Sequence, residues 1–205
     1  MGEPLEVKIT MLGKQGVGKT SLSQRFHSDT FQAHVPPTIG ASFMAKTIEV
    51  GTAKVKLYIW DTAGTERFQS LSPMYIRSGH IVFICFDEPD LKSITEKIKV
   101  TMENNQFAKI FLVATKQDLI QDIFAYDVIK EYATSQGYPL YYTSSLTYNG
   151  IHKLFLDAAV EGQLVAESMA RRKGQVVKIF ADEPVSTQGW CCYNSWPYWS
   201  TQKTG

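Results

Sequence analysis

Apolar residues along the chain gather into short continuous runs and into longer segments with helical spacing. Short runs bounded by turn residues predict strands, whereas apolar residues that recur every three or four positions, as between Leu91 and Met102, predict helices. The expected strands are Glu6–Leu12, Ala41–Val50, Lys54–Trp60, Ile81–Phe86, Lys109–Ala114 and Leu140–Tyr142. The expected helices are Ser21–Ser28, Asp90–Asn104, about Ala125–Gln136 and about Tyr148–Ala170.

The order of these segments predicts an α/β fold. Strands that alternate with helices form a doubly wound, mostly parallel sheet, here six-stranded, with helices on both faces. The turn Gly51-Thr52-Ala53 joins two of the strands as a hairpin, so one strand is expected to be antiparallel. Ligands of such sheets bind beyond the carboxyl ends of the strands, and the polar loops of this chain are expected at that edge.

One of these loops carries a complete phosphate-binding motif. The chain reads Gly13-Lys14-Gln15-Gly16-Val17-Gly18-Lys19-Thr20 between an expected strand and an expected helix, which fits the pattern G-x-x-x-x-G-K-[ST]. The N–H groups of such a loop, together with Ser21 at the start of the helix, bind phosphate oxygens. Lys19 is expected to reach the β- and γ-phosphates, and Thr20 to ligate Mg²⁺. The alternative is a glycine-rich turn that arose by chance.

A second short motif, Asp61-Thr62-Ala63-Gly64, follows the second hairpin strand. An Asp at this point can hold Mg²⁺ through water, and the N–H of Gly64 can donate to a γ-phosphate. Taken alone the motif is weak, because an Asp before a turn is common. Its position after the phosphate loop is what makes it a candidate for the same site.

Composition narrows the class of protein. At 205 residues the chain is long enough for one hydrophobic core, and a net charge of +1 gives no support for a nucleic-acid-binding surface. No apolar run reaches the roughly 18 residues that span a bilayer, and Met1-Gly2-Glu3-Pro4 lacks the basic start of a secretion signal. We therefore expect a cytosolic protein, with Cys85 as a reduced core residue.

The chain resembles a known family in two stretches. Both are similar to the switch segments of small Ras-type GTPases, and among these most of all to the Rab branch. The first stretch is Thr38-Ile39-Gly40 followed by Phe43, and the second is Lys56-Leu57-Tyr58-Ile59-Trp60-Asp61-Thr62-Ala63-Gly64-Thr65-Glu66-Arg67-Phe68. The resemblance covers about residues 6 to 170. It implies a P-loop NTPase domain over residues 1–170, with GTP or GDP and Mg²⁺ as cofactors. It also implies a monomeric switch in vesicle traffic, whose partners are effectors, an exchange factor and a GTPase-activating protein.

The resemblance assigns further site residues. It implies that Phe31 lies edge-on to guanine, and that Thr38 contacts Mg²⁺ and the γ-phosphate. Asp118 would accept from guanine N1–H and N2–H₂, two donors that adenine does not offer together. The two base-binding loops that the resemblance implies are Thr115, Lys116, Asp118 and Leu119, and Thr143, Ser144 and Ser145.

An effector surface is also implied. Rab proteins present an aromatic triad between the switches, and Phe43, Trp60 and Tyr75 stand at the matching positions, with Ile39 beside them. On spacing alone these aromatics could equally be core residues, because half-buried aromatics are common in strands.

The catalytic positions depart from the family. The expected catalytic residues are Lys19, Thr65 and Gln15. Ras-type proteins place a Gln four residues after the residue that corresponds to Asp61, where it orients the attacking water, and this chain has Thr65 there. Gln15 stands where a small residue is usual and would crowd an arginine finger. Slow hydrolysis is expected, unless Gln15 supplies the missing amide. The rival hypothesis is a constitutively GTP-bound module that recruits effectors without hydrolysing.

Smaller departures concern the base and the lid. Thr115 replaces an Asn, so guanine selectivity is expected to survive with lower affinity. Val35 replaces a common Tyr, and Leu146 replaces a lysine in the second base-binding loop.

The predicted tail, residues 171–205, is expected to be flexible. Cys191-Cys192 looks like the geranylgeranylated pair of Rab proteins, which would place the chain on the cytosolic face of endomembranes, but Tyr193–Gly205 follow it. Three alternatives stay open: the extension is removed or is a sequence artefact, the cysteines are palmitoylated, or the tail binds protein and the molecule is soluble.

Overall fold

The computed structural model describes residues 5–64 and 72–181. Its centre is a six-stranded sheet in the order β2-β3-β1-β4-β5-β6, in which β2 is antiparallel to β3 and the other neighbours are parallel. The strands are β1 Leu5–Leu12, β2 Ala41–Val50, β3 Ala53–Thr62, β4 Ile81–Phe86, β5 Lys109–Ala114 and β6 Leu140–Tyr142. The helices are α1 Lys19–Ser28, α2 Ser72–Ser78, α3 Leu91–Asn104, α4 Asp127–Gln136 and α5 Ile151–Ala181. This arrangement confirms the predicted fold class.

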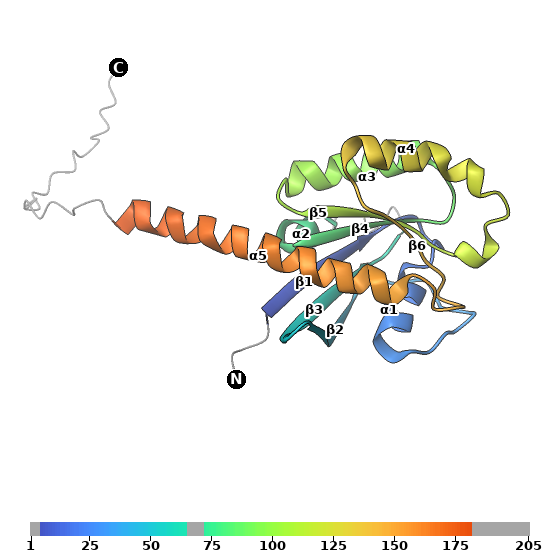
Figure 1. Cartoon of the computed structure of the whole chain (residues 1–205), viewed down its shortest axis with the longest axis horizontal. Coiled ribbons are helices and arrows are strands. Elements are labelled where there is room, and N and C mark those ends of the chain that lie inside the picture. Colours follow the sequence, from blue (N-terminus) through green and yellow to red (C-terminus); the bar gives the residue numbers. More distant parts are fainter. Residues whose placement is uncertain (1–4, 65–71, 182–205) are drawn as a thin grey trace, which may run out of the picture.

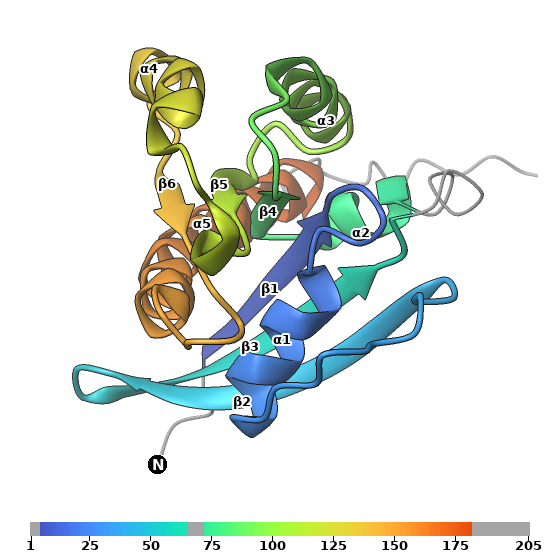
Figure 2. The same ribbon diagram turned by 90° about the vertical axis from the view of Figure 1, so that its right-hand side faces the viewer.

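Each face of the sheet carries its own hydrophobic core. On one face Leu22 and Phe26 of α1 and Phe155 of α5 pack against the strands, and Phe26 stacks on Phe155 with ring centroids 3.8 Å apart. On the other face α2, α3 and α4 pack against the same strands (Figures 1 and 2). β4 serves both cores, because successive side chains of a strand point to opposite faces. A continuous apolar run is the result, as expected of a parallel strand that is covered on both sides.

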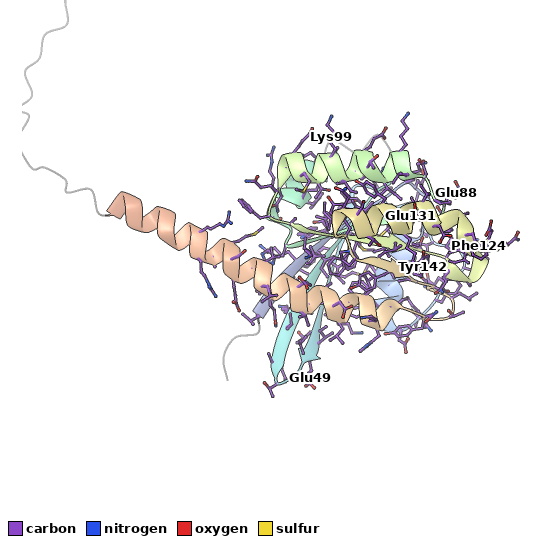
Figure 3. All side chains as sticks on the ribbon, turned by 45° about the horizontal axis from the view of Figure 1, so that its top comes forward. Glu49, Glu88, Lys99, Phe124, Glu131 and Tyr142 are labelled. Atoms are coloured by element: carbon purple, nitrogen blue, oxygen red, sulfur yellow. The ribbon has the colours of Figure 1, made fainter. Side chains whose placement is uncertain are left out.

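The termini of several helices differ from the prediction. α1 begins at Lys19, inside the phosphate-loop motif, because Gly18 takes a left-handed conformation (φ 94°) at the N-cap and lets the helix start there. α4 begins at Asp127, and the residues before it form a 3-10 turn, Ile123–Tyr126. From this turn the side chain of Phe124 projects outwards (Figure 3) and is 76% exposed. The short helix α2 was not predicted, because seven residues that include Pro73 carry little helical periodicity.

The predicted end of the last helix, about Ala170, is wrong. α5 runs on to Ala181 and past the edge of the sheet (Figure 1), so residues 171–181 of the predicted flexible tail are helical. The first proline beyond it is Pro184, so nothing stronger than the isolated Gly174 opposes the helix.

Three of the predicted functional residues lie outside the described part of the chain. They are Thr65, Cys191 and Cys192. The described helices include none that is both long enough and apolar enough to cross a membrane.

Candidate functional site

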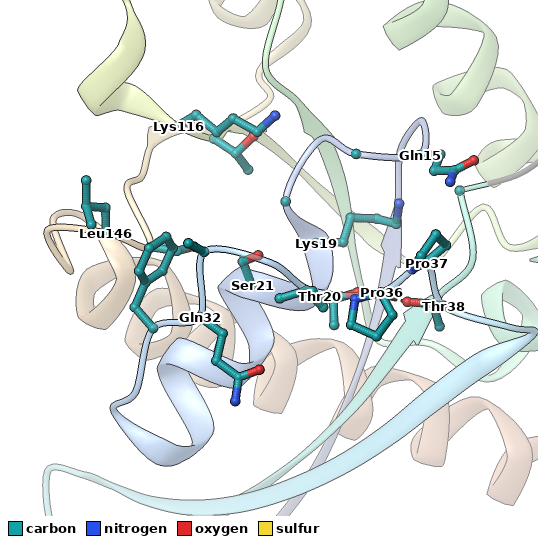
Figure 4. A pocket seen from close by; sticks show the side chains of 18 of the residues that line it. Gln15, Lys19, Thr20, Ser21, Gln32, Pro36, Pro37, Thr38, Lys116 and Leu146 are labelled. Atoms are coloured by element: carbon teal, nitrogen blue, oxygen red, sulfur yellow. Dashed lines mark hydrogen bonds between the residues drawn. The ribbon is translucent and has the colours of Figure 1, made fainter.

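A cavity of about 460 Å³ lies at the carboxyl ends of the strands, where the phosphate loop follows β1. Lys116 and Leu146 lie at one end of it and Gln15 and Thr38 at the other, with Lys19 between them (Figure 4). The lining residues are Gln15, Gly16, Gly18, Lys19, Thr20, Ser21, Phe31, Gln32, Ala33, Val35, Pro36, Pro37, Thr38, Gly64, Thr115, Lys116, Asp118, Leu119, Ser145 and Leu146. Most of the residues predicted from the sequence to bind a nucleotide are thus brought together.

The side chain of Lys19 forms hydrogen bonds to the backbone of the phosphate loop. Its ammonium group donates to the backbone carbonyls of Gly13 (3.0 Å) and Lys14 (2.9 Å), and the residue is 5% exposed. Burial lowers the pKa of Lys19, because a charged ammonium is costly away from water. An anionic group in the cavity would favour the charged form, which is the electrostatic requirement of a phosphate site.

Thr20, Thr38 and Asp61 form an oxygen-rich cluster beside the phosphate loop. The Thr20 hydroxyl donates to Asp61 Oδ2 (2.6 Å) and lies 2.9 Å from the Thr38 hydroxyl. Asp61 is fully buried, its other oxygen Oδ1 has no hydrogen-bond partner in the described part of the chain, and burial raises its pKa. A buried carboxylate with one unpaired oxygen is costly unless a cation or donor joins it. Hydroxyl and carboxylate oxygens are the ligands that Mg²⁺ prefers, so the donor set fits this ion.

Gly64 lies against the phosphate loop. A Cβ at this position would be 2.3 Å from the backbone N of Gln15 and 2.4 Å from the carbonyl carbon of Lys14. Any side chain here would overlap backbone atoms, so the contact between the Asp61–Gly64 segment and the phosphate loop requires glycine.

The end of the cavity that Lys116 and Leu146 line, called the base end here, is formed by loops that polar contacts connect. Thr115, which is 3% exposed, has its hydroxyl 2.5 Å from the carbonyl of Val17 and 3.1 Å from that of Phe86. Lys116 forms an ion pair with Asp87 (Nζ to Oδ2 2.6 Å). These contacts tie the base-binding loop to the phosphate loop and to the end of β4.

Asp118 reaches the cavity from the other side of this loop. Its Oδ1 accepts from the hydroxyl of Ser144 (2.5 Å). The amide of Ser144 is engaged by Asn149, whereas those of Ser145 and Leu146 make no hydrogen bond within the described residues. The site therefore offers a carboxylate acceptor and two nearby backbone donors, the complement of a guanine N1–H and O6 edge.

Apolar side chains surround this end of the cavity. Phe31, Leu119 and Leu146 line it and are 40%, 68% and 54% exposed. Large apolar side chains left this open to solvent can cover the faces and edges of a planar ring.

Some predicted residues support the site without lining it. Gly13 and Lys14 contribute only carbonyls to Lys19, and Val17 belongs to the hydrophobic core. Thr143 and Ser144, of the second of the two predicted base-binding loops, are buried. Conversely, Gln32 and Ala33 line the cavity although no motif marks them in the sequence.

The predicted effector residues form one surface. Phe43 packs on Trp60 and Trp60 on Tyr75, with ring centroids 4.7 and 5.0 Å apart. Ile39 is 85% exposed, Phe43 is 49% exposed, and Trp60 and Tyr75 are half-buried, so none of the four is a fully buried core residue. Tyr58, stacked on Phe43 at 5.7 Å, extends the row, and its β-strand spacing from Trp60 could have marked it.

Comparison with known proteins places the chain in a family. A model of the Ras family matches residues 8–163. The chain is 33% identical over 201 residues to the GTP-binding protein YPT1 of Saccharomyces cerevisiae, covering 90% of this chain and 96% of that protein. It is 31% identical over 192 residues to the Ras-related protein RABD2b of Arabidopsis thaliana (90% and 95% covered). It is 37% identical over 155 residues to the Ras-related protein Rab-31 of Rattus norvegicus (73% and 80% covered). The chain therefore belongs to the Ras family and is a small GTPase of the Rab type.

Proposed function

We propose that the protein is a guanine-nucleotide switch that binds GTP and GDP with Mg²⁺ in the cavity described above. The observation that carries the proposal is the placement of three chemistries at one cavity: the Lys19 ammonium, the hydroxyl groups of Thr20 and Thr38 with the Asp61 carboxylate buried behind Thr20, and the Asp118 carboxylate. Each fits a different part of the ligand, namely the phosphates, the metal ion and the base.

The residues divide the work as follows. The N–H groups of the phosphate loop and Lys19 hold the phosphates, and Thr20, Thr38 and Asp61 hold Mg²⁺, which supplies charge neutralisation when bound. Asp118 and the amides of Ser145 and Leu146 select guanine. Contacts of Thr38 and Gly64 with the γ-phosphate would order the segments around them, and loss of that phosphate would release them.

Nucleotide titration tests base selection. We expect GTP and GDP to bind and ATP to compete only at concentrations higher by orders of magnitude, because adenine leaves the Asp118 carboxylate without its two donors. Equal affinity for ATP and GTP would contradict the proposal.

Slow hydrolysis is the second part of the proposal. Thr65 is too short to orient water as Gln does, and Gln15 is exposed at the phosphate end of the cavity. Single-turnover hydrolysis of bound GTP should be very slow in the natural chain and faster in Thr65→Gln. If the natural chain is as fast as that variant, another group orients the water, and Gln15→Ala in the natural chain shows whether that group is Gln15.

The rival is a GTP-bound recruiter that does not hydrolyse at all. The aromatic row Phe43, Trp60 and Tyr75 would suit any protein that binds effectors, so it does not distinguish the recruiter from the switch. GTP that stays intact for hours on the natural chain, but turns over on Thr65→Gln, would favour the recruiter over the switch.

Membership in the Rab type supports action in vesicle traffic, and we propose that lipid groups on Cys191 and Cys192 hold the protein on the cytosolic face of endomembranes. The mass of the intact protein from its native cells tests the anchor. Two isoprenoid groups on a chain that ends near Cys192 support it, whereas an unmodified chain of 205 residues contradicts it.

A further inference from the structure

The loop between β4 and α3 is connected by ion pairs to two loops of the cavity. It comprises residues 87–90, and these four residues do not line the cavity themselves. Asp87 pairs with Lys116, on the loop after β5, over 2.6 Å. Asp90 pairs with Lys14 of the phosphate loop, also over 2.6 Å. These are the two shortest ion pairs in the described part of the chain, and both link a segment outside the cavity to a segment that forms it.

Asp90 uses both of its carboxylate oxygens. Oδ1 accepts from the backbone N–H of Ser93 (3.0 Å) and caps α3, while Oδ2 accepts from the Lys14 ammonium (2.6 Å). The backbone of Asp90 is held as well, because its N–H donates to the carbonyl of Glu88 and its carbonyl accepts from the N–H of Ile94. The Lys14 side chain is therefore bound to a residue whose own position is fixed at the start of a helix.

The peptide group of Lys14 lies where the phosphate loop meets its neighbours. Its carbonyl oxygen accepts from the Lys19 ammonium (2.9 Å), and a Cβ on Gly64 would lie 2.4 Å from its carbonyl carbon. On the preceding residue, a Cβ on Gly13 would lie 2.4 Å from the carbonyl oxygen of Cys85 in β4. Because the backbone is packed this closely, a shift of Lys14 would move the acceptor of Lys19 and the contact with Gly64 together.

The pair has no competitor among the described residues. Neither Lys14 nor Asp90 forms another ion pair there, and Lys97 of α3, which lies nearby, donates instead to the hydroxyl of Ser93 (3.4 Å). The two side chains of the pair are 59% and 38% exposed, so solvent screens their attraction. We therefore expect a modest effect on the phosphate loop.

We propose that Asp90 is a positioning residue of the nucleotide site, whose ion pair with Lys14 holds the phosphate loop in the conformation that binds phosphate. The inference rests on the proposed function, since it concerns the nucleotide bound there. Asp90 does not line the cavity, so it acts through Lys14. A negative charge near a phosphate site by itself weakens phosphate binding. Positioning and charge thus predict opposite effects when the carboxylate is made neutral.

The test is Asp90→Asn, which removes the charge but keeps an oxygen for the cap, because Asn caps helices as well as Asp. The dissociation rate of a fluorescent GDP analogue is measured with Mg²⁺ in the full chain. Positioning predicts release about threefold faster than from the natural chain, as expected of a partly screened ion pair. Charge alone predicts slower release.

Three further variants identify the cause. Lys14→Met should also release the analogue about threefold faster, and Asp90→Asn should not speed release further in that background, since the pair is already absent. Lys14→Arg keeps a charged donor and should release it more slowly than Lys14→Met. Glu161→Gln is the matched control, because it breaks the similarly exposed ion pair with Lys109 (3.7 Å), whose residues do not line the cavity, and it should leave the rate unchanged.

Every outcome bears on the inference. Release from Asp90→Asn at the natural rate or more slowly overturns it, and so does further acceleration by Asp90→Asn in the Lys14→Met background. If Asp90→Asn does not fold, Lys14→Met and Lys14→Arg decide: the inference fails if the first releases the analogue at the natural rate or if the second is as fast as the first. If the natural chain binds no GDP, the proposed function fails and the inference fails with it.

Discussion

Asp61 is the residue on which the proposed Mg²⁺ site depends. It is fully buried, with one oxygen bonded to Thr20 and the other without a partner among the described residues. Its bonded neighbour among the described residues is the hydroxyl of Thr20. Burial raises the pKa of Asp61, and the nearby Lys19 ammonium opposes this rise without forming an ion pair with the carboxylate there. A divalent ion would satisfy the unpaired oxygen and offset the cost of burying the charge.

Removal of Mg²⁺ is therefore expected to release the nucleotide. With excess EDTA, the dissociation rate of a fluorescent GDP analogue should rise by about tenfold or more, because the phosphates lose their counter-charge. In Asp61→Asn the rate should already be high without EDTA and should change by less than about threefold on chelation. Thr47→Val, at an exposed threonine of β2, is the control and should respond like the natural chain. Equal responses of Asp61→Asn and the natural chain would argue against a metal site here.

At this scale the sequence identifies chemistry better than contacts. The motif residues could be named because their spacing is local, as in Gly13–Thr20. The role of Thr115 could not, since its hydroxyl meets a carbonyl 98 positions earlier in the chain. Gln32 and Ala33 belong to the cavity through the path of their backbone, and no residue type at their positions marks that path.

Elements were predicted well where one pattern filled the whole element. β4 and β5 have the predicted bounds, because parallel strands covered on both faces are continuously apolar. The half-exposed strands β2 and β6 have the predicted bounds as well. The pattern fails for α2, which is short, and at the end of α5, where the helix leaves the core and periodicity no longer reports burial. Packing between elements, such as the contacts of Gly162 and Asn105, cannot be read from the sequence.

Gly162 sets how closely α5 approaches the sheet. A Cβ there would lie 2.3 Å from Cγ1 of Val7 on β1 and 3.3 Å from Cγ1 of Ile81 on β4, both fully buried. Alanine favours a helix by about 1 kcal/mol over glycine, but overpacking a core costs about 1–3 kcal/mol. We expect Gly162→Ala to lower the free energy of unfolding by about 1 kcal/mol in urea titration.

A double-mutant cycle checks the cause. Val7→Ala should cost less in the Gly162→Ala background than in the natural chain, because the added methyl group fills the space. Ser168→Ala, on the exposed part of α5, is the control for helix propensity. Stabilisation by Gly162→Ala would mean that the helix shifts without cost.

Asn105, which follows α3, forms hydrogen bonds to the end of α2 and to Gly79 after it. Its amide donates to the carbonyls of Ile76 (3.0 Å) and Gly79 (2.9 Å), and its oxygen accepts from the N–H of Phe107 (3.1 Å). Asn105→Ala leaves the buried Gly79 carbonyl without its donor and removes one of the two donors to the Ile76 carbonyl, which also accepts from the N–H of Gly79. The variant should lower the free energy of unfolding by about 2 kcal/mol. The neighbouring Asn104, which bonds only to its own helix, is the matched control, and Asn104→Ala should cost less than about 0.5 kcal/mol. Equal losses in the two variants would rule out a special role for Asn105.

At the scale of the whole molecule, the cavity and the aromatic row are joined through the backbone. Thr38 lines the cavity and Ile39 follows it on the surface, while β3 carries Trp60 next to Asp61. On both segments, a residue at the phosphate end (Thr38 or Asp61) is therefore the direct neighbour in sequence of a residue of the candidate partner surface (Ile39 or Trp60). The candidate ligand-contacting residues and most of the candidate partner surface thus lie on the same two segments, β3 and the segment that runs from Thr38 into β2.

This coupling predicts a change in the fluorescence of Trp60. The other tryptophans of the chain, Trp190, Trp196 and Trp199, can be replaced by phenylalanine, so that emission reports only the ring packed between Phe43 and Tyr75. Exchange of GDP for a non-hydrolysable GTP analogue should change the intensity or the wavelength of that emission, because the γ-phosphate orders the segment around Thr38. Thr38→Ala should bind both nucleotides but show a smaller change, since its hydroxyl no longer reports the phosphate. Identical spectra in the natural background, with binding of both nucleotides shown independently, would mean that the aromatic row does not respond to the nucleotide and that any partner here binds in either state.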